Sequence, residues 1–300
     1  MTGRTDRAQT RAGIRRLKAL LPHGLLERGL GLYVGHRRRR ARRPRRIAGI
    51  LQTRDYTDAC AAFDSLAALC DVTLVLDDNS ATPFPFRDRC SEYVALRNRA
   101  GWNASANLTL LFYRACVHAC DWIVTLEDDL LLSHQAQDRQ TVADRIARAE
   151  RRKLDIVFFR WRDLWDTEER YRTDGVFACK TFPFLRRNWF FDHAVSVVPP
   201  AHRLHASVYP ENRIPRWEID GEGVVYHAGC LTRELRQARV DKYRREDPDH
   251  RFQADYAYIL DETGLETRAV PGEDLEILRR KFQRDRFTAA RGPARDAGAG

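Results

Sequence analysis

The sequence predicts an α/β fold in which helices cover both faces of a mostly parallel sheet. Short apolar runs alternate with longer amphipathic runs over residues 46–161, and two of the apolar runs end in clustered carboxylates. Such alternation is typical of β-α-β units. A chain of 300 residues, of which 43% are hydrophobic, is also long enough to bury a substantial core.

Each expected element follows from its local pattern. Buried strands are predicted by apolar runs that end in polar turns, at 46–53 (RIAGILQT), 71–80 (DVTLVLDDNS), 92–98 (EYVALRN), 121–129 (DWIVTLEDD) and 154–161 (LDIVFFRW). Helices are predicted between them, at 58–70, 104–120 and 140–153. A further strand is expected at 188–200 (NWFFDHAVSVVPP). Residues 160–172 (RWRDLWDTEERYR) are either a loop or an amphipathic segment with Trp161 and Trp165 buried.

The positive charge of the chain is concentrated at its start. Residues 1–46 carry 15 Lys/Arg and two acids, a charge of +13, so the remainder of a chain whose total is +10 has a charge of −3. We expect residues 1–46 to be a partly helical or disordered leader. Three interpretations of this leader are open: a peripheral anchor on an anionic membrane surface, a nucleic-acid arm, or a solvated extension. Because the body is nearly neutral, nucleic acid is not its expected partner.

Composition excludes several other classes of protein. No apolar run approaches the roughly 20 residues that span a bilayer. The first residues lack the pattern of a secretory signal, so a cytoplasmic protein is expected. The seven cysteines show no zinc-type spacing, which favours reduced, mostly buried thiols.

Acidic residues follow two of the predicted strands where each strand ends. In an open α/β sheet, ligands bind beyond the carboxyl ends of the strands. Clustered carboxylates repel one another unless a cation compensates them, and carboxylate oxygens suit Mg²⁺ or Mn²⁺. The residues concerned are Asp77-Asp78-Asn79-Ser80 and Glu127-Asp128-Asp129.

The segments ILQTRD, VLDDNS, RNRAGWNASAN and IVTLEDD, in this order, resemble the nucleotide-sugar-dependent glycosyltransferases of the GT-A fold. The resemblance covers residues 46 to about 160 and is greatest to family two, with its DDxS and DxD-type strand ends. The EDD spelling also resembles the N-acetylglucosaminyltransferases that act on N-glycans. In the triplet the first acid is Glu127 rather than Asp, so its carboxylate reaches further.

The resemblance implies a role for individual positions. Glu127 and Asp129 would bind Mn²⁺ or Mg²⁺, with Asp129 as the direct ligand, and Asp128 would face the sugar or ribose. The remaining nucleotide-site residues would be Thr53 and Arg54 as its lining, Asp77 or Asp78 on a base expected to be uracil or on its ribose, and Arg97 near the diphosphate.

Residues 215–229 (PRWEIDGEGVVYHAG) carry the expected acceptor-side chemistry. Trp217 could stack on a sugar, and Glu218 or Asp220 could be the general base that an inverting transfer requires. His227 could complete the metal shell or contact the diphosphate. The alternatives are solvated turn acids and a structural histidine.

The sequence therefore predicts a metal-dependent, inverting glycosyltransferase that moves a sugar from a UDP-sugar to a glycan, a lipid-linked or another hydroxyl acceptor. Residues 47–290 would form one domain, with the nucleotide-sugar half at 47–160 and the acceptor half at 161–290, before a disordered tail at 291–300. A nucleotidyltransferase is the nearest alternative, but LQTRDYTDA lacks the glycine-rich loop that would hold a triphosphate. A nucleic-acid-binding protein would leave both acidic strand ends unexplained.

Overall fold

The structure is a computed structural model that describes residues 45–54, 59–96, 104–188, 214–250 and 255–290. The leader over 1–44, Arg97, nearly all of the strand expected at 188–200 and the tail lie outside the described residues.

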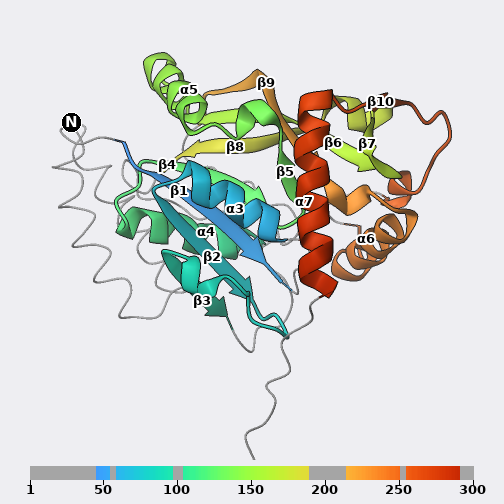
Figure 1. The fold of residues 1–300 in the computed structure, drawn as a ribbon, viewed down its shortest axis with the longest axis horizontal. Helices are drawn as coiled ribbons and strands as arrows, with labels where there is room; N and C mark the ends of the chain where they lie inside the picture. Colours follow the sequence, from blue (N-terminus) through green and yellow to red (C-terminus); the bar gives the residue numbers. More distant parts are fainter. Residues whose placement is uncertain (1–44, 55–58, 97–103, 189–213, 251–254, 291–300) are drawn as a thin grey trace, which may run out of the picture.

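The strands of the described residues form one mixed sheet, shown in Figure 1, and the α/β class is confirmed. The strand order is β10-β7-β6-β8-β4-β1-β2-β3, with β9 paired to both β5 and β6. The pairs that join β1 to β2, β1 to β4 and β2 to β3 are parallel, whereas β8 joins both β4 and β6 in antiparallel fashion. The sheet is thus parallel in its first half and mixed in its second half.

The elements of the first half lie close to their expected positions. Apolar runs form the strands β1 (Ile47–Thr53), β2 (Val72–Asp78), β3 (Glu92–Leu96) and β4 (Trp122–Glu127). Between them lie the helices α3 (Ala59–Leu69) and α4 (Ala104–Val117). In the pairings with β1, Thr53 lies opposite Asp77 and Gln52 opposite Glu127, so the acidic ends of β2 and β4 flank the end of β1.

The alternation of side chains along β1 creates a core on each face of the sheet. Ile47 and Leu51 pack in the cluster that contains residues of α3, whereas Ala48 and Ile50 pack in the cluster that contains residues of α4. Figure 1 shows α3 and α4 on opposite faces. At Gly49 a Cβ atom would lie 2.9 Å from the Cβ atom of Leu66, so glycine allows α3 to approach the sheet closely.

The second half is built mainly from antiparallel pairs. Its strands are β5 (Leu130–Leu132), β6 (Ile156–Trp165), β7 (Thr167–Arg172), β8 (Thr181–Arg187), β9 (Trp217–His227) and β10 (Thr267–Ala269). The segment at 160–172 is the β6–β7 hairpin, in which Trp165 is buried and Trp161 is partly buried. It is therefore an ordered part of the sheet and not a loop.

The helices that accompany the second half are α5 (Arg139–Arg152), α6 (Arg233–Glu246) and α7 (Gly272–Ala290). Asp138 caps α5 by accepting from Thr141 N, as expected of an aspartate at that position. Short 3₁₀ helices occur at 87–89, 134–136, 175–179, 228–230 and 257–259. Within the described part of the chain, no helix combines the length and apolar character needed to cross a bilayer.

Candidate functional site

A cavity of about 610 Å³ lies at the carboxyl ends of β1 and β4. Its walls also include residues of α4, β6, β8, β9 and α6, so both halves of the chain contribute. The charged residues that line it are the acids Glu127, Asp128, Asp129 and Asp163 and the cations Arg54, Lys180, Arg186, Arg239 and Lys242. The cavity thus combines a carboxylate cluster with a slight excess of cations.

Glu127 and Asp128 are the less compensated acids of the triplet. Burial raises the pKa of Glu127, and the charge of Asp129 raises it further. Burial and the neighbouring charges of Asp129 and Glu127 raise the pKa of Asp128 to about 7, although a hydrogen bond from Thr53 Oγ1 (3.1 Å) opposes the shift. An added cation would stabilise the ionised form of both groups.

Asp129 is the acid of the triplet that is bound to protein cations. Its Oδ2 accepts from His227 Nε2 at 2.9 Å and faces Arg239 Nη2 at 3.4 Å. Burial alone would raise the pKa of Asp129, but His227 and Arg239 bring it far below its usual range. The other oxygen, Oδ1, is buried without a hydrogen-bond partner among the described residues.

His227 reaches the triplet because β9 pairs with β5, the short strand that follows the acids. Leu130 lies opposite His227 in this pairing, and Ala228 N donates to the carbonyl of Asp129 at 2.9 Å. On the other side, His227 Nδ1 lies 2.6 Å from Asp163 Oδ1. Burial lowers the pKa of His227, as does Arg239, yet the two carboxylates raise it well above the ordinary value. A carboxylate thus faces each ring nitrogen, an arrangement that suits a charged imidazole, which has a donor at both nitrogens.

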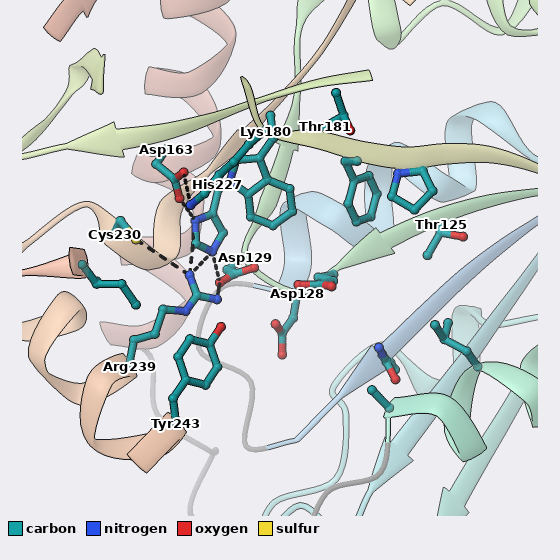
Figure 2. A pocket seen from close by; sticks show the side chains of 18 of the residues that line it. Thr125, Asp128, Asp129, Asp163, Lys180, Thr181, His227, Cys230, Arg239 and Tyr243 are labelled. Carbon is teal, nitrogen blue, oxygen red and sulfur yellow. Dashed lines mark hydrogen bonds and ion pairs between the residues drawn. The ribbon is translucent and has the colours of Figure 1, made fainter. Parts of the chain in front are cut away.

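Figure 2 shows Asp163, His227, Asp129 and Arg239 pointing toward one another, with Lys180 beside Asp163. Lys180 Nζ donates to Asp163 Oδ2 at 2.9 Å, so both oxygens of Asp163 are bound. Ligand atoms of Asp163, His227 and Cys230 also lie within 4.8 Å of one another, a spacing that a metal ion could bridge. Because Arg239 contacts both His227 and the sulfur of Cys230, a guanidinium already lies against this group.

The residues expected to bind the nucleotide base do not line the cavity. Asp77 is fully buried and accepts from Tyr93 Oη (2.5 Å) and Ser80 N (2.9 Å). Asp78 is equally buried and accepts from Asn107 Nδ2 at 2.9 Å. Both acids thus hold the ends of neighbouring elements together, and their contacts leave the cavity to other groups.

Arg54 does line the cavity, as expected. Its Nε donates to the carbonyl of Asp78 at 2.6 Å, and its Nη2 lies 3.4 Å from Asp78 Oδ1. Asp78 therefore positions Arg54, which places a cation at the end of β1. Thr53 reaches the site indirectly, through its hydrogen bond to Asp128.

Glu218 and Asp220 are not brought to the cavity. Asp220 Oδ2 accepts from Arg145 Nε (2.9 Å) and Arg148 Nη2 (2.6 Å) on α5, and Glu218 pairs with Arg148 and Arg152. Neither acid is among the residues that line the cavity. This placement does not favour either as the general base, because each carboxylate is bound to arginines that would have to be displaced.

Sequence reasoning missed Asp163, Lys180, Arg239 and Lys242. Asp163 joins the site because it lies opposite His227 in the parallel β6–β9 pairing, a contact between residues 64 positions apart. Arg239 and Lys242 are three residues apart on α6, so they share a helix face. That spacing is visible in the sequence, but the edge of the sheet on which the helix packs is not.

No protein-family model matches the chain, and no curated protein matches it. Among solved structures, Rv0371c from Mycobacterium tuberculosis H37Rv is similar at 16% identity and a TM-score of 0.33, over 59% of this chain and 89% of that one. The mannose-1-phosphate geranyltransferase from Thermus thermophilus is similar at 12% identity and a TM-score of 0.26, over 43% of this chain and 45% of its own. Both scores are low, and neither similarity assigns a family or an activity to this chain.

Proposed function

We propose that this protein is a GT-A-type glycosyltransferase that moves a sugar from a nucleoside diphosphate sugar to a hydroxyl acceptor. The observation that supports it is the cavity, which combines three adjacent carboxylates with five Lys/Arg at the carboxyl ends of parallel strands. A diphosphate with a divalent cation fits such a lining, because the cation suits the carboxylates and the phosphates suit the surrounding Lys/Arg.

Among the described residues, only Asp163, His227 and Cys230 bring three ligand atoms within 4.8 Å of one another, so the carboxylates of the triplet would have to turn to share a divalent cation. Asp129 Oδ1 is a buried oxygen without a partner among the described residues, and burial together with the neighbouring carboxylates raises the pKa values of Glu127 and Asp128. We propose that Glu127 and Asp129 hold Mn²⁺ or Mg²⁺ together with Asp128, which the resemblance instead places at the sugar or ribose. When bound, the cation would stabilise the negative charge of the departing diphosphate.

Other residues of the cavity would orient the carboxylates and bind the donor. His227, fixed between Asp163 and Asp129, orients the Asp129 carboxylate. Arg54, Lys180 and Lys242 surround the cavity with positive charge that favours an anionic donor. Trp161, whose ring centre lies 4.6 Å from that of His227, presents an aromatic surface to the same space.

The finer assignments remain proposals from the resemblance. They are a uridine nucleotide, inversion at the transferred sugar, a glycan or lipid-linked acceptor, and a cytoplasmic protein whose residues 1–46 hold it at an anionic membrane surface.

Calorimetric titration with UDP, GDP, CDP and ADP, each with and without Mn²⁺, tests the proposal. We expect one nucleoside diphosphate, UDP first, to bind only when Mn²⁺ is present. Failure of all four with Mn²⁺ would overturn the proposal. Binding of a nucleoside triphosphate without binding of any diphosphate would favour a nucleotidyltransferase instead.

A further inference from the structure

Helix α6 presents Arg239, Lys242 and Tyr243 to the cavity, at helical spacings of three and four residues. The helix is fixed independently of these side chains. Arg236, which is buried, donates to the carbonyl of Cys230 at 3.1 Å and pairs with Asp166 and Glu262 at 3.0 Å each. The Arg239 side chain can therefore change its partner without displacing α6.

Arg239 occupies the position of a counter-cation to Asp129. Its Nη2 lies 3.4 Å from Asp129 Oδ2, and its Nη1 contacts His227 Nε2, which lies 2.9 Å from the same oxygen. Oδ2 is thus shared by Arg239 and His227. Oδ1 has no hydrogen-bond partner among the described residues.

Gly229 shows how closely these groups are packed. A Cβ atom at residue 229 would lie 2.4 Å from Asp129 Oδ2, 2.7 Å from His227 Nε2 and 2.8 Å from Arg239 Nη1. The backbone at residue 229 therefore approaches all three groups at once, and a side chain there would have to displace them. An additional cation would have to bind on the other side of Asp129, toward Oδ1.

A divalent cation bound at Asp129 would lie beside the Arg239 guanidinium, and like charges at such short range repel. Arg239 has a long side chain and a planar guanidinium that binds phosphate oxygens in pairs. The cavity that it lines is also where a diphosphate would bind.

We propose that Arg239 is the resident counter-cation of Asp129 in the free protein and that it transfers to the donor's diphosphate when a divalent cation binds. The inference rests on the proposed function, because it needs a donor whose diphosphate meets the metal. Arg239 would then suppress metal binding in the absence of donor and strengthen donor binding in the presence of metal.

Two affinities measured on Arg239→Gln test the inference. The affinity of the free protein for Mn²⁺, measured by electron paramagnetic resonance without nucleotide, should rise about tenfold, because a competing cation is removed. The affinity for inorganic pyrophosphate in the presence of Mn²⁺ should fall about tenfold, because a charged hydrogen-bond donor is lost. Pyrophosphate is chosen because it is independent of the base.

Arg244→Gln is the matched control. Arg244 lies on the same helix, is exposed and does not line the cavity, so its loss changes the net charge equally and should leave both affinities unchanged. Arg239→Lys keeps the charge without the planar fork. It should bind Mn²⁺ as the wild type does and bind pyrophosphate with intermediate affinity, and it serves if Arg239→Gln does not fold.

The outcomes separate the two proposals. If the wild type binds neither Mn²⁺ nor pyrophosphate, the proposed function fails and the inference with it. If the wild type binds both Mn²⁺ and pyrophosphate, and Arg239→Gln lowers both affinities or changes neither, Arg239 does not transfer from Asp129 to the diphosphate. The inference is then overturned while the proposed function stands. Only opposite changes in the two affinities support it.

Discussion

Two clusters of carboxylates in this protein differ in how far the protein itself compensates them. Asp220, on β9 against α5, accepts from two arginines at Oδ2 and from the backbone nitrogens of Glu222 and Gly223 at Oδ1 (2.9 and 2.8 Å). Arg145, its buried partner, lowers the pKa of Asp220 to about 2 against the opposing effect of burial. At the end of β4, by contrast, Glu127 and Asp128 keep raised pKa values, and Asp129 keeps an oxygen without a hydrogen-bond partner among the described residues.

The comparison teaches that acid density does not by itself mark a ligand site. Both clusters combine Asp with Glu within a few residues of one another. The fold supplies three arginines from α5 to one cluster, whereas the other faces a cavity, where Asp129 Oδ1 has no hydrogen-bond partner among the described residues. A buried polar group without a hydrogen-bond partner in the protein is a candidate to bind a ligand, whereas one with such partners contributes to the fold.

Asp220→Asn should have the largest effect on stability and none on binding. Removing one charge of a pair in which both side chains are 3% exposed leaves Arg145 buried without its partner, which costs about 3–5 kcal/mol in the free energy of unfolding. Urea denaturation would measure it. Because the folded pKa of Asp220 is depressed, the difference from wild type should shrink as the pH falls from about 4 toward about 2. A loss of Mn²⁺ binding at neutral pH, in a variant still folded, would contradict the structural role.

Asp163→Asn should sharpen the contrast, because it removes the group that orients His227 behind the triplet. Asp163 holds His227 at 2.6 Å, and the loss of such an outer partner typically lowers metal affinity about 10- to 100-fold. Isothermal calorimetry with Mn²⁺ would show the change. An unchanged affinity together with a lowered unfolding midpoint would mean that the Asp163–His227 pair acts only in folding.

The pH dependence of Mn²⁺ binding should follow Asp128. Its carboxyl must lose a proton to bind a cation, so affinity should rise about tenfold per pH unit below its pKa of about 7 and level off above it. In Asp128→Asn this rise should be absent. A wild-type affinity that does not change between pH 6 and pH 8 would contradict the pKa given to Asp128.

The same raised pKa acts in the opposite direction on the metal-free protein. The contribution of Asp128 to stability is fully present below its ordinary pKa of 3.8 and is lost as the pH rises through about 7. Mn²⁺ should therefore stabilise the protein more at pH 8 than at pH 6, which thermal unfolding at the two pH values would show.

Glu218→Gln should have the smallest effect. Its partners Arg148 and Arg152 are 41% and 60% exposed, so solvent screens the pairs and their loss should cost no more than about 1 kcal/mol. Urea denaturation beside Asp220→Asn makes the comparison. Equal losses in the two variants would show that the α5 arginines stabilise the strand as one network.

The first half of the fold could be predicted from the sequence because its signals are local. Each of β1, β2 and β4 is an apolar run bounded by polar residues, and parallel pairing brings their carboxyl ends to one edge. The second half depends on pairings between distant residues, such as Leu130 with His227, which no local pattern encodes. The sequence therefore suggests His227 as a metal-site residue, but its position between Asp129 and Asp163 emerges only from the fold.

The roles of Asp77, Asp78, Glu218 and Asp220 show the same limit. The sequence shows that a residue is acidic but not which residue it contacts in the fold. These four acids are bound by Tyr93, Asn107 and the arginines of α5. The partner of each acid is a property of the folded arrangement, and these four find their partners away from the cavity that the triplet lines.

One measurement tests the central claim most directly: titration of Mn²⁺ with UDP present, followed by electron paramagnetic resonance, on wild type, Asp129→Asn and Asp220→Asn. The two variants remove the same charge from the two clusters. We expect wild type and Asp220→Asn to bind Mn²⁺ alike, and Asp129→Asn to lose binding. Retention of Mn²⁺ binding by Asp129→Asn at the wild-type affinity would contradict the assignment of the ligand site to the end of β4.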